Sequence, residues 1–331
     1  MVSVRDVAAE AGVSVGTVSH ALNHPDRVSP DNLARVYAAI ERLGFVRNEG
    51  ARQLRAGRSR SIGLVVLDAG NPFFADVARG AELAAAEAGL TVLVGNSVEN
   101  PHRESAYLDL FGEQRVSGVL VTPTTDDPAR LHRLRDQGIP VVLVDRELPG
   151  SGLSSVIVND TLGGDLAATH LFDHGRRRLA FIGGPLTLPQ VSHRLDGARA
   201  AAARTPGASV EVVERSALTV LEGRAAGGDL LARPEPDRPD AIFCANDLLA
   251  VGVLQALVMG GGVRVPEDIA LVGYDDIDFA SATVVPLTSV RQPARRIGSS
   301  AVELLVRQVA DPAGEPQVVR FDPELVVRSS S

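Results

Sequence analysis

Lysine is absent from this chain of 331 residues, and cysteine occurs only once. All 33 basic residues are therefore arginine, a bias that we attribute to genome composition and not to a binding function. A single cysteine excludes an internal disulfide. Cys244 stands in the apolar run AIFCA, which indicates a buried structural thiol.

Long hydrophobic runs are also missing. No apolar stretch approaches the roughly 20 residues that span a bilayer, and Arg5 and Asp6 stand where a secretory signal needs an apolar core. We therefore expect a cytoplasmic protein without a membrane span. The hydrophobic content of 45% is sufficient for a sizeable core in more than one domain.

Signatures of catalysis are sparse. The phosphate-binding patterns GxxxxGK and GxGxxG do not occur. His170 and His174 have the spacing of metal ligands on one helix face, but no Glu or Cys completes the set. Their tract THLFDHGRRR fits a helix end, where His and Arg meet the negative end of the dipole. We therefore predict no catalytic residue, no metal and no cofactor.

The N-terminal run VSVRDVAAEAGVSVGTVSHALN predicts two short helices joined by a tight turn. Ser3 and Asp6 form a capping-box pattern for a helix from about Ser3 to Ala11, which Gly12 ends. Ser14 can cap the second helix. The inward stripes consist of Val4, Val7, Ala8, Ala11, Val18, Ala21 and Leu22. Small or polar residues point outward from the second helix, namely Gly16, Ser19, His20 and Asn23.

A third helix is predicted between its cap Ser29 and Gly44, with Pro30 at its first position. Three helices in under fifty residues can bury one small core, and this geometry serves all-helical packing modules as well as DNA-binding modules. Charge favours DNA, because residues 1–60 contain nine Arg against six Asp or Glu in a chain of net charge -8. The predicted buried stripe of the third helix is Leu33, Val36, Tyr37, Ile40 and Leu43.

Longer motifs are similar to one protein family along nearly the whole chain. VRDVAAEAGVSVGTVSHALN, followed by VSPDNLARVYAAIERLGFVRN and ARQL, resembles the DNA-binding headpiece of the LacI/GalR family of bacterial transcription regulators. NPFF, FCAND, VPEDIALVGYDD and PELVVRSS continue the similarity. The resemblance implies a helix-turn-helix headpiece at 1–47, a hinge helix or linker at 48–60, and an effector-binding and dimerisation core at 61–331.

The resemblance and the helical wheel together give a set of DNA contacts. His20 and Asn23 point outward on the wheel, whereas Val15 does not, so that its assignment comes from the resemblance alone. The predicted DNA-binding residues are Ser14, Val15, Gly16, Thr17, Ser19, His20, Asn23, Arg52, Leu54 and Arg55.

The linker NEGARQLRAGRSR is rich in arginine and poor in apolar residues. Gly50 lowers its helix propensity, and it is too short to be a stable isolated helix. By resemblance it is a hinge helix that folds on DNA, pairs with its copy in the dimer and inserts Leu54 into the minor groove. Its charge run alone also fits a solvated basic tether.

From Ser61 onward, short runs rich in Val, Ile and Leu alternate with Ala-rich helical stretches. The runs are IGLVVL, TVLVGN, GVLVTP and VVLVD, and then, after about residue 160, LAFIGG, VEVVE, AIFCAN and IALVGY. They predict two doubly wound parallel-sheet α/β lobes. The resemblance implies a periplasmic-binding-protein-like core that closes by hinge motion. Its lobe one is expected at about 61–159 plus 292–321, and lobe two at about 160–290 plus 322–331.

Ligands of open α/β sheets bind beyond the carboxyl ends of strands, and polar residues recur there in this chain. Together with neighbouring phenylalanines they suit a sugar or a nucleoside-like ligand, because hydroxyls need acceptors and the apolar ring side needs an aromatic face. Asn246 or Asp247 fits a helix cap equally well. The candidates found in this way are Asn71, Phe73, Phe74, Asp145, Asn246, Asp247 and Asp275.

The resemblance adds Arg194 and Gln292 to the ligand site. By sequence alone, Arg194 could clamp a carboxylate, a phosphate or vicinal hydroxyls, or it could form an ion pair. Leu218 stands near the position where many family members carry an aromatic residue, and Leu188 and Gln190 occupy positions that vary with ligand class. These departures leave the ligand unnamed.

We therefore expect a homodimeric repressor that binds an inverted repeat in double-stranded DNA under the control of a sugar, polyol or nucleoside-type effector. Two other classes were considered, a solute-binding protein of a transport system and an enzyme on the same fold. The basic headpiece and the absence of a signal sequence argue against the first class. The absence of a catalytic constellation argues against the second.

Overall fold

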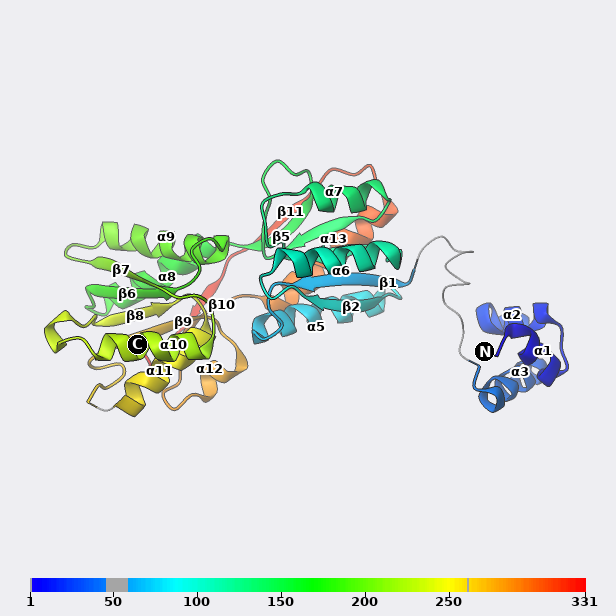
Figure 1. Cartoon of the computed structure of the whole chain (residues 1–331), viewed down its shortest axis with the longest axis horizontal. Coiled ribbons are helices and arrows are strands. Elements are labelled where there is room, and N and C mark those ends of the chain that lie inside the picture. The colour runs from blue at the N-terminus through cyan, green and yellow to red at the C-terminus, as the bar shows by residue number, and fades with distance from the viewer. Residues whose placement is uncertain (1, 46–58, 261) are drawn as a thin grey trace. The chain divides into compact units, whose positions relative to one another are not determined.

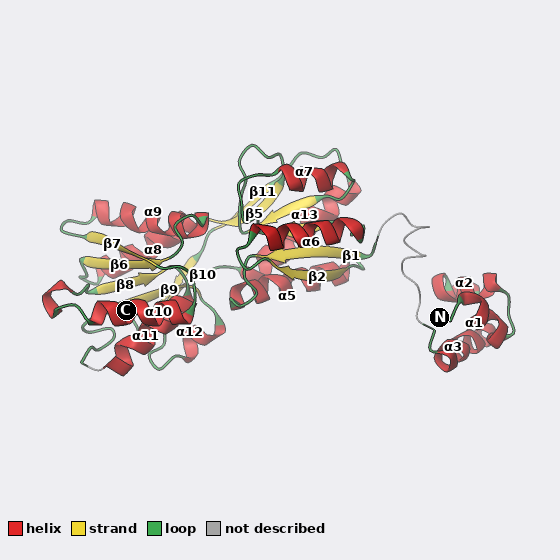
Figure 2. Cartoon of the chain, in the orientation of Figure 1, coloured by secondary structure: helices red, strands yellow, loops and turns green. Residues whose placement is uncertain are grey.

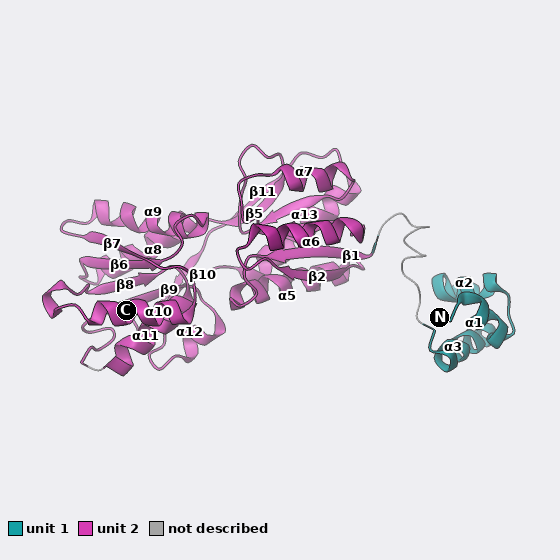
Figure 3. Ribbon diagram, viewed as in Figure 1, with its two compact units in different colours: residues 1–59 teal, residues 60–331 magenta. Residues whose placement is uncertain are grey.

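The computed structural model describes residues 2–45, 59–260 and 262–331, which belong to two compact units, Met1–Ser59 and Arg60–Ser331 (Figure 3). The predicted hinge residues Arg52, Leu54 and Arg55 lie outside the described residues. Within the described ranges, no helix is long and apolar enough to cross a membrane.

The first unit is a bundle of three helices. The Ser3 backbone N–H donates to Asp6 Oδ2 at 2.7 Å and Ser3 Oγ accepts from the Asp6 N–H, which is the predicted capping box. Gly12 ends the first helix at φ 62°, and Ser14 Oγ accepts from the Thr17 N–H at 3.0 Å. The elements are α1 (Val4–Ala11), α2 (Val15–Asn23), the 3-10 helix η1 (Pro25–Arg27) and α3 (Pro30–Leu43).

The core of this unit contains apolar side chains from all three helices. Two details of α3 differ from the sequence prediction. Tyr37 is 48% exposed because Val36 and Ala39 are the residues of α3 that face the core. Ser29 makes no side-chain cap, and Pro30 occupies the first turn. The buried residues are Val7, Ala8, Ala11, Val18, Ala21, Val36 and Ala39.

The second unit contains two six-stranded sheets, which we call the first and second lobes with the helices that cover them. The first sheet has the order β11-β5-β4-β3-β1-β2, and the second has the order β12-β10-β9-β8-β6-β7. Strand β10 pairs with β12 antiparallel, and β9 with β10 parallel. The strands are β1 (Ser61–Val66), β2 (Thr91–Asn96), β3 (Val119–Val121), β4 (Val141–Val144), β5 (Ser154–Val158), β6 (Arg178–Gly183), β7 (Ser209–Glu214), β8 (Ala241–Cys244), β9 (Ala270–Asp275), β10 (Thr288–Arg291), β11 (Val318–Phe321) and β12 (Glu324–Val326).

Helices lie on both faces of each sheet, as Figure 2 shows. Because both faces are covered, the central strands are buried along most of their length, which is why they are continuous apolar runs in the sequence. The helices are α5 (Pro72–Glu87), α6 (Pro101–Glu113), α7 (Ala129–Asp136), α8 (Asp160–Asp173), α9 (Pro189–Arg204), α10 (Val220–Leu231), the 3-10 helix η2 (Glu235–Asp237), α11 (Asp247–Gly260), α12 (Asp278–Ala282) and α13 (Ala294–Ala310).

The chain passes between the lobes three times (Figure 1). It leaves the first sheet after β5 for α8, returns after β10 to α13, and leaves again after β11 for β12. We call the connections 158–160, 291–294 and 321–324 the three crossing segments. They bring residues that are distant in the sequence to the facing ends of both sheets.

Candidate functional site

A small cavity lies between the two lobes, and we call it the interlobe cavity. Side chains from the carboxyl ends of strands and from the following helices line it, as expected for an open α/β sheet. Eight of the nine predicted ligand residues come together here, although the chain separates them by up to 221 positions, from 71 to 292. The lining consists of Leu67, Asn71, Phe73, Phe74, Asp145, Leu188, Gln190, Val191, Arg194, Leu218, Asn246, Asp275 and Gln292.

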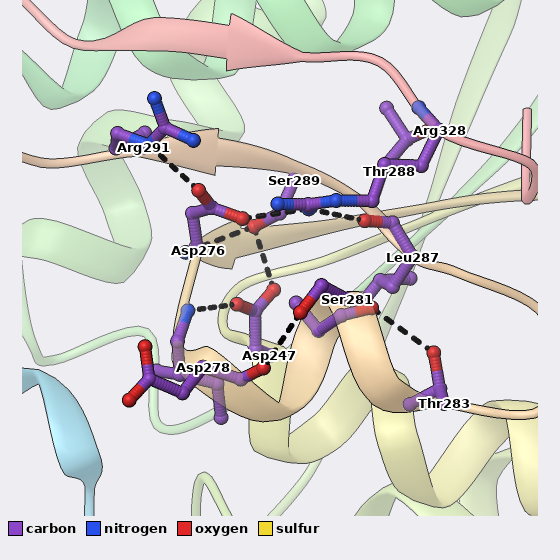
Figure 4. A network of polar contacts seen from close by, with 12 residues as sticks. Asp247, Asp276, Asp278, Ser281, Thr283, Leu287, Thr288, Ser289, Arg291 and Arg328 are labelled. Carbon is purple, nitrogen blue, oxygen red and sulfur yellow. Dashed lines mark hydrogen bonds and ion pairs between the residues drawn. The ribbon is translucent and has the colours of Figure 1, made fainter.

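Asp247 is the exception and corrects the sequence prediction. Its side chain is fully buried in the second lobe and does not line the cavity. One carboxylate oxygen accepts from the Ile277 N–H at 2.9 Å, and the other accepts from Ser289 Oγ at 2.7 Å (Figure 4). Burial raises its pKa, with a further contribution from Asp275, against the effect of these two hydrogen bonds. Asp247 therefore supports the loop after β9.

Arg194 lines the cavity and is only 4% exposed. Its Nε donates to Asp160 Oδ1 at 2.7 Å, and one terminal nitrogen donates to the Ala245 carbonyl oxygen at 2.6 Å. The guanidinium also lies 3.7 Å from the centroid of the Tyr274 ring. Burial acts against the charge, but Asp160, Tyr274 and Asp275 outweigh it and raise the pKa of Arg194. Arg194 is thus a buried ion-pair partner.

Asp160 was missed by the sequence prediction. It directly follows Asn159 at the end of β5, so that the strand-end pattern used for the other residues also applies to it. Helix α8 begins at Asp160 and packs closely on α9. The two helices are so close that a Cβ atom at Gly164 would overlap the Arg194 carbonyl oxygen. This close approach holds Arg194 against Asp160.

Asp275 joins the two lobes across the cavity. Its Oδ2 accepts from Asn71 Nδ2 at 2.9 Å, and its Oδ1 accepts from Gln292 Nε2 at 2.7 Å. Its backbone has φ 104°, outside the range that non-glycine residues prefer. Burial raises the pKa of the Asp275 carboxyl, although Arg194 and the two amide donors lower it.

Asp145 forms another contact between the lobes. The Gln190 amide donates to the Asp145 carbonyl oxygen at 2.9 Å and to its Oδ2 at 3.1 Å. Burial and then the charge of Asp160 raise the pKa of Asp145 to about 8, against the opposing effect of Arg194. Gln190, which sequence reasoning noted only as a variable position, is therefore part of the site.

Asn71 and Asn246 combine two roles. Asn71 Oδ1 accepts from the Phe73 N–H at 3.0 Å, and Asn246 Oδ1 accepts from the Leu249 N–H at 2.9 Å. Both residues therefore cap helices, as the alternative interpretation of Asn246 proposed, and both also line the cavity. Near Asn71 the rings of Phe73 and Phe74 meet edge to face at a centroid distance of 5.0 Å.

The surface of α2 presents the predicted DNA contacts of the first unit. Val15, which the wheel did not place outward, is 47% exposed. Arg35 of α3 donates to the Gly12 carbonyl oxygen at 3.1 Å and so fixes the turn that leads to α2. Thr17 and Ser19 are half-buried, and the exposed residues are Ser14, Val15, Gly16, His20 and Asn23.

His170 of α8 and His174, the residue that follows the helix, lie with ring centroids 4.3 Å apart. His170 Nε2 is 2.8 Å from Ser331 Oγ, and burial followed by the His174 charge lowers its pKa. The described part of the chain contains no group of three metal-ligating side chains. His170 thus contacts the C-terminal residue Ser331.

Comparison with known proteins identifies both parts of the chain. Residues 3–48 match the family described as bacterial regulatory proteins, lacI family, and residues 168–331 match a periplasmic binding protein-like domain. The ribose operon repressor of Escherichia coli (strain K12) is 35% identical over 345 residues, which cover 100% of both proteins.

Solved structures agree. A Lac repressor dimer bound to operator and the anti-inducer ONPF is 26% identical with a TM-score of 0.84, over 99% of this chain and 98% of that one. A LacI family regulator from Enterococcus faecium with bound ribose is 25% identical with a TM-score of 0.73, over 82% of this chain and 98% of that one. The present chain therefore belongs to the LacI family of bacterial regulatory proteins.

Proposed function

We propose that this ligand-responsive DNA-binding repressor has as its effector an uncharged, polyhydroxylated metabolite of the monosaccharide class, bound in the interlobe cavity. The observation that carries the proposal concerns two atoms. Among the described residues that line the cavity, Asp145 Oδ1 and Gln292 Oε1 are buried without a hydrogen-bond partner. Gln292 Oε1 only accepts, whereas Asp145 Oδ1 accepts when ionised and donates when protonated. A sugar hydroxyl satisfies both atoms because it donates and accepts.

The charge balance of the cavity supports an uncharged ligand. Arg194 is surrounded by the carboxyls of Asp145, Asp160 and Asp275. Two of its three nitrogens are already bound to Asp160 and to the Ala245 carbonyl oxygen. A phosphate or carboxylate would face these carboxyls with little cationic compensation, and burying it would be costly. The ribose named for two of the related proteins is of the proposed class.

A comparison of D-ribose with D-ribose 5-phosphate tests this proposal. Isothermal titration calorimetry should show binding of D-ribose, and the phosphate should bind at least about 100-fold more weakly because of the uncompensated charge. Equal or tighter binding of the phosphate would overturn the charge argument. Absence of D-ribose binding would remove ribose as the effector, and a panel of pentoses, hexoses, polyols and nucleosides would then decide the class.

We further propose that α2 enters the major groove and that two copies of the chain bind an inverted repeat. The proposal is supported by the exposed polar face of α2 and by the related dimer bound to operator. The linker 48–60, with Leu54 as a minor-groove wedge, belongs to the same proposal. Selection from a random duplex library should enrich an inverted repeat, and enrichment of single half-sites would contradict the dimeric binding mode.

The chain is proposed to act by binding alone, in the cytoplasm, without turning over its ligand. The related proteins are transcriptional repressors, which supports this view. Prolonged incubation with D-ribose, followed by NMR of the sugar, should return unchanged D-ribose. A new sugar product would revive the enzymatic alternative.

A further inference from the structure

The turn after β9 aims Asp275 into the interlobe cavity through an unusual backbone. Asp275 and Asp276 have φ values of 104° and 53°, two consecutive non-glycine residues at positive φ. Such conformations cost free energy and persist only where the surroundings enforce them. The contacts around this turn therefore decide where the Asp275 carboxylate lies.

The backbone of the turn is held from the side of the second sheet. The Asp276 N–H donates to Ser289 Oγ at 3.0 Å, and Ser289 Oγ donates to Asp247 Oδ1 at 2.7 Å. The other oxygen of Asp247 accepts from the Ile277 N–H at 2.9 Å. Figure 4 shows that Asp247 and Ser289 lie directly against this loop. Two successive N–H groups are thus anchored on buried polar side chains.

The Asp276 side chain points away from the cavity and meets two arginines. Its Oδ2 accepts from Arg291 Nε at 2.7 Å, and its Oδ1 forms an ion pair of 2.6 Å with a terminal nitrogen of Arg328 (Figure 4). The carboxylate is only 5% exposed, so solvent screens these contacts little. Arg328 also donates to the Leu287 carbonyl oxygen at 2.7 Å, which fixes its position.

Arg291 adjoins one crossing segment, and Arg328 lies just beyond the strand that a second crossing segment leads into. Arg291 is the last residue of β10, and the chain continues from it through Gln292 to α13 in the first lobe. Arg328 follows β12, which the chain enters from β11 of the first lobe. Arg291 also binds Glu324 of β12 at 2.8 Å, so that the two segments are linked with each other as well as with Asp276.

We propose that Asp276 is a positioning residue that holds Asp275 toward the effector and links the occupied cavity to two of the three crossing segments. On one side of the turn, Asp275 binds Asn71 of the first lobe and Gln292. On the other side, Asp276 binds Arg291 and Arg328. A change in the contacts of Asp275 is therefore transmitted to β10 and β12, the strands that adjoin these two crossing segments. The inference rests on the proposed function in taking Asp275 as an effector contact.

Asp276→Asn tests the inference, because it keeps the shape of the side chain and removes its charge. D-ribose affinity should fall by at least about tenfold, since the ion pairs no longer enforce the turn. Operator affinity without the sugar should remain within about twofold of the wild type, because the turn lies in the effector-binding unit. Asp268→Asn is the matched control, since it removes the exposed pair of Asp268 with Arg264, 2.7 Å long, elsewhere in the second lobe.

Hydrogen exchange separates a positioning role from a merely structural one. At saturating D-ribose, the wild type should gain amide protection in residues 288–291 and 324–328, and Asp276→Asn should not. A residue needed only for stability would lower the melting temperature and leave this sugar-induced protection in place. Unchanged D-ribose affinity together with retained protection would overturn the inference. If Asp276→Asn does not fold, Arg328→Gln removes the ion pair from its other side.

Failure of the proposed function gives a different pattern. If the wild type does not bind D-ribose, ribose is not the effector, and exchange of the ligand-free proteins judges the positioning role. Asp276→Asn should then exchange about tenfold faster than Asp268→Asn at Ile277 and in residues 324–328. Equal exchange rates in the two variants would overturn the inference.

Discussion

Asn71 of the first lobe donates a hydrogen bond of 2.9 Å to Asp275 of the second lobe, across the cavity that both residues line. The two residues are separated by 204 positions in the sequence. Their carboxylate and amide groups are also the types of group that bind sugar hydroxyls. If the effector binds here as proposed, it competes with this contact, and effector binding is then coupled to the relative arrangement of the lobes.

The first prediction concerns Asp275→Ala. We expect the variant to lose the response to D-ribose because the side chain offers an acceptor to the sugar and joins the two lobes. Operator affinity of the sugar-free protein should stay near that of the wild type, because the contact between Gln190 and Asp145 still joins the lobes. Fluorescence anisotropy with labelled operator, with and without D-ribose, measures both quantities. A variant that still responds at unchanged sugar concentration would remove Asp275 from the site.

The second prediction concerns sequence reading by α2. His20 is exposed on the outward face of this helix. His20→Ala should weaken binding to the selected operator by about 1–3 kcal/mol and change binding to random duplex much less, because base contacts specify whereas phosphate contacts position. Competition titrations with both duplexes, at one salt concentration, make the comparison. Equal losses on the two duplexes would show that His20 contacts the backbone.

The helix ends of the first unit could be predicted from the sequence because they depend on contacts between residues close together in the chain. Ser3, Asp6, Gly12 and Ser14 act through neighbours at most a few residues away, so their residue types suffice to place the helix ends. Tyr37 was placed wrongly, because its spacing also fits the buried stripe and only the packing of α3 decides which side of the stripe is covered. The spacing of apolar residues predicts which face of a helix is buried, but it does not predict which residues at the margin of that face are exposed.

In the second unit, the sequence predicts the strands that consist of long apolar runs. Strands β10, β11 and β12 have four, four and three residues and contain arginine or glutamate, so no apolar run marks them. The site was predictable as a collection of strand ends. The direction of each side chain was not, because Asp145 and Asp275 adopt positive φ without glycine, and Asp247 turns inward to Ser289. These choices depend on tertiary contacts.

The third prediction concerns dimer formation. Strand β2 is an edge of the first sheet, where Leu93 is 40% exposed, and Leu83 on the adjoining helix α5 is 63% exposed. An exposed apolar edge favours pairing with another chain, and we expect a second copy to cover it. Leu83→Asp combined with Leu93→Asp should give a monomer in sedimentation velocity and lower operator affinity. Val318→Asp, on the opposite edge strand β11, is the control and should remain a dimer; a dimeric double variant would place the interface elsewhere.

The fourth prediction concerns pH. Burial, followed by the charge of Asp160 and offset in part by Arg194, raises the pKa of Asp145 to about 8 from an ordinary value of 3.8. Between these values the folded protein keeps a proton that the unfolded chain releases. The stabilisation linked to this proton is therefore complete below pH 4, declines as the pH rises, and is lost above the folded pKa.

Asp145→Asn cannot ionise and isolates this effect. Between pH 5 and pH 8.5, the free energy of unfolding of the wild type should fall by about 4 kcal/mol more than that of Asp145→Asn. The raised pKa of Asp247 acts in both proteins and cancels in the difference. Urea denaturation at the two pH values measures this difference in the free energy of unfolding.

Asp268→Asn is the control and should follow the wild type over this range, since the pKa of Asp268 is lowered to about 2 by Arg264. Parallel pH profiles of the wild type and Asp145→Asn would show that Asp145 is ionised in the folded protein, and a ligand would then meet an acceptor at this position throughout the range.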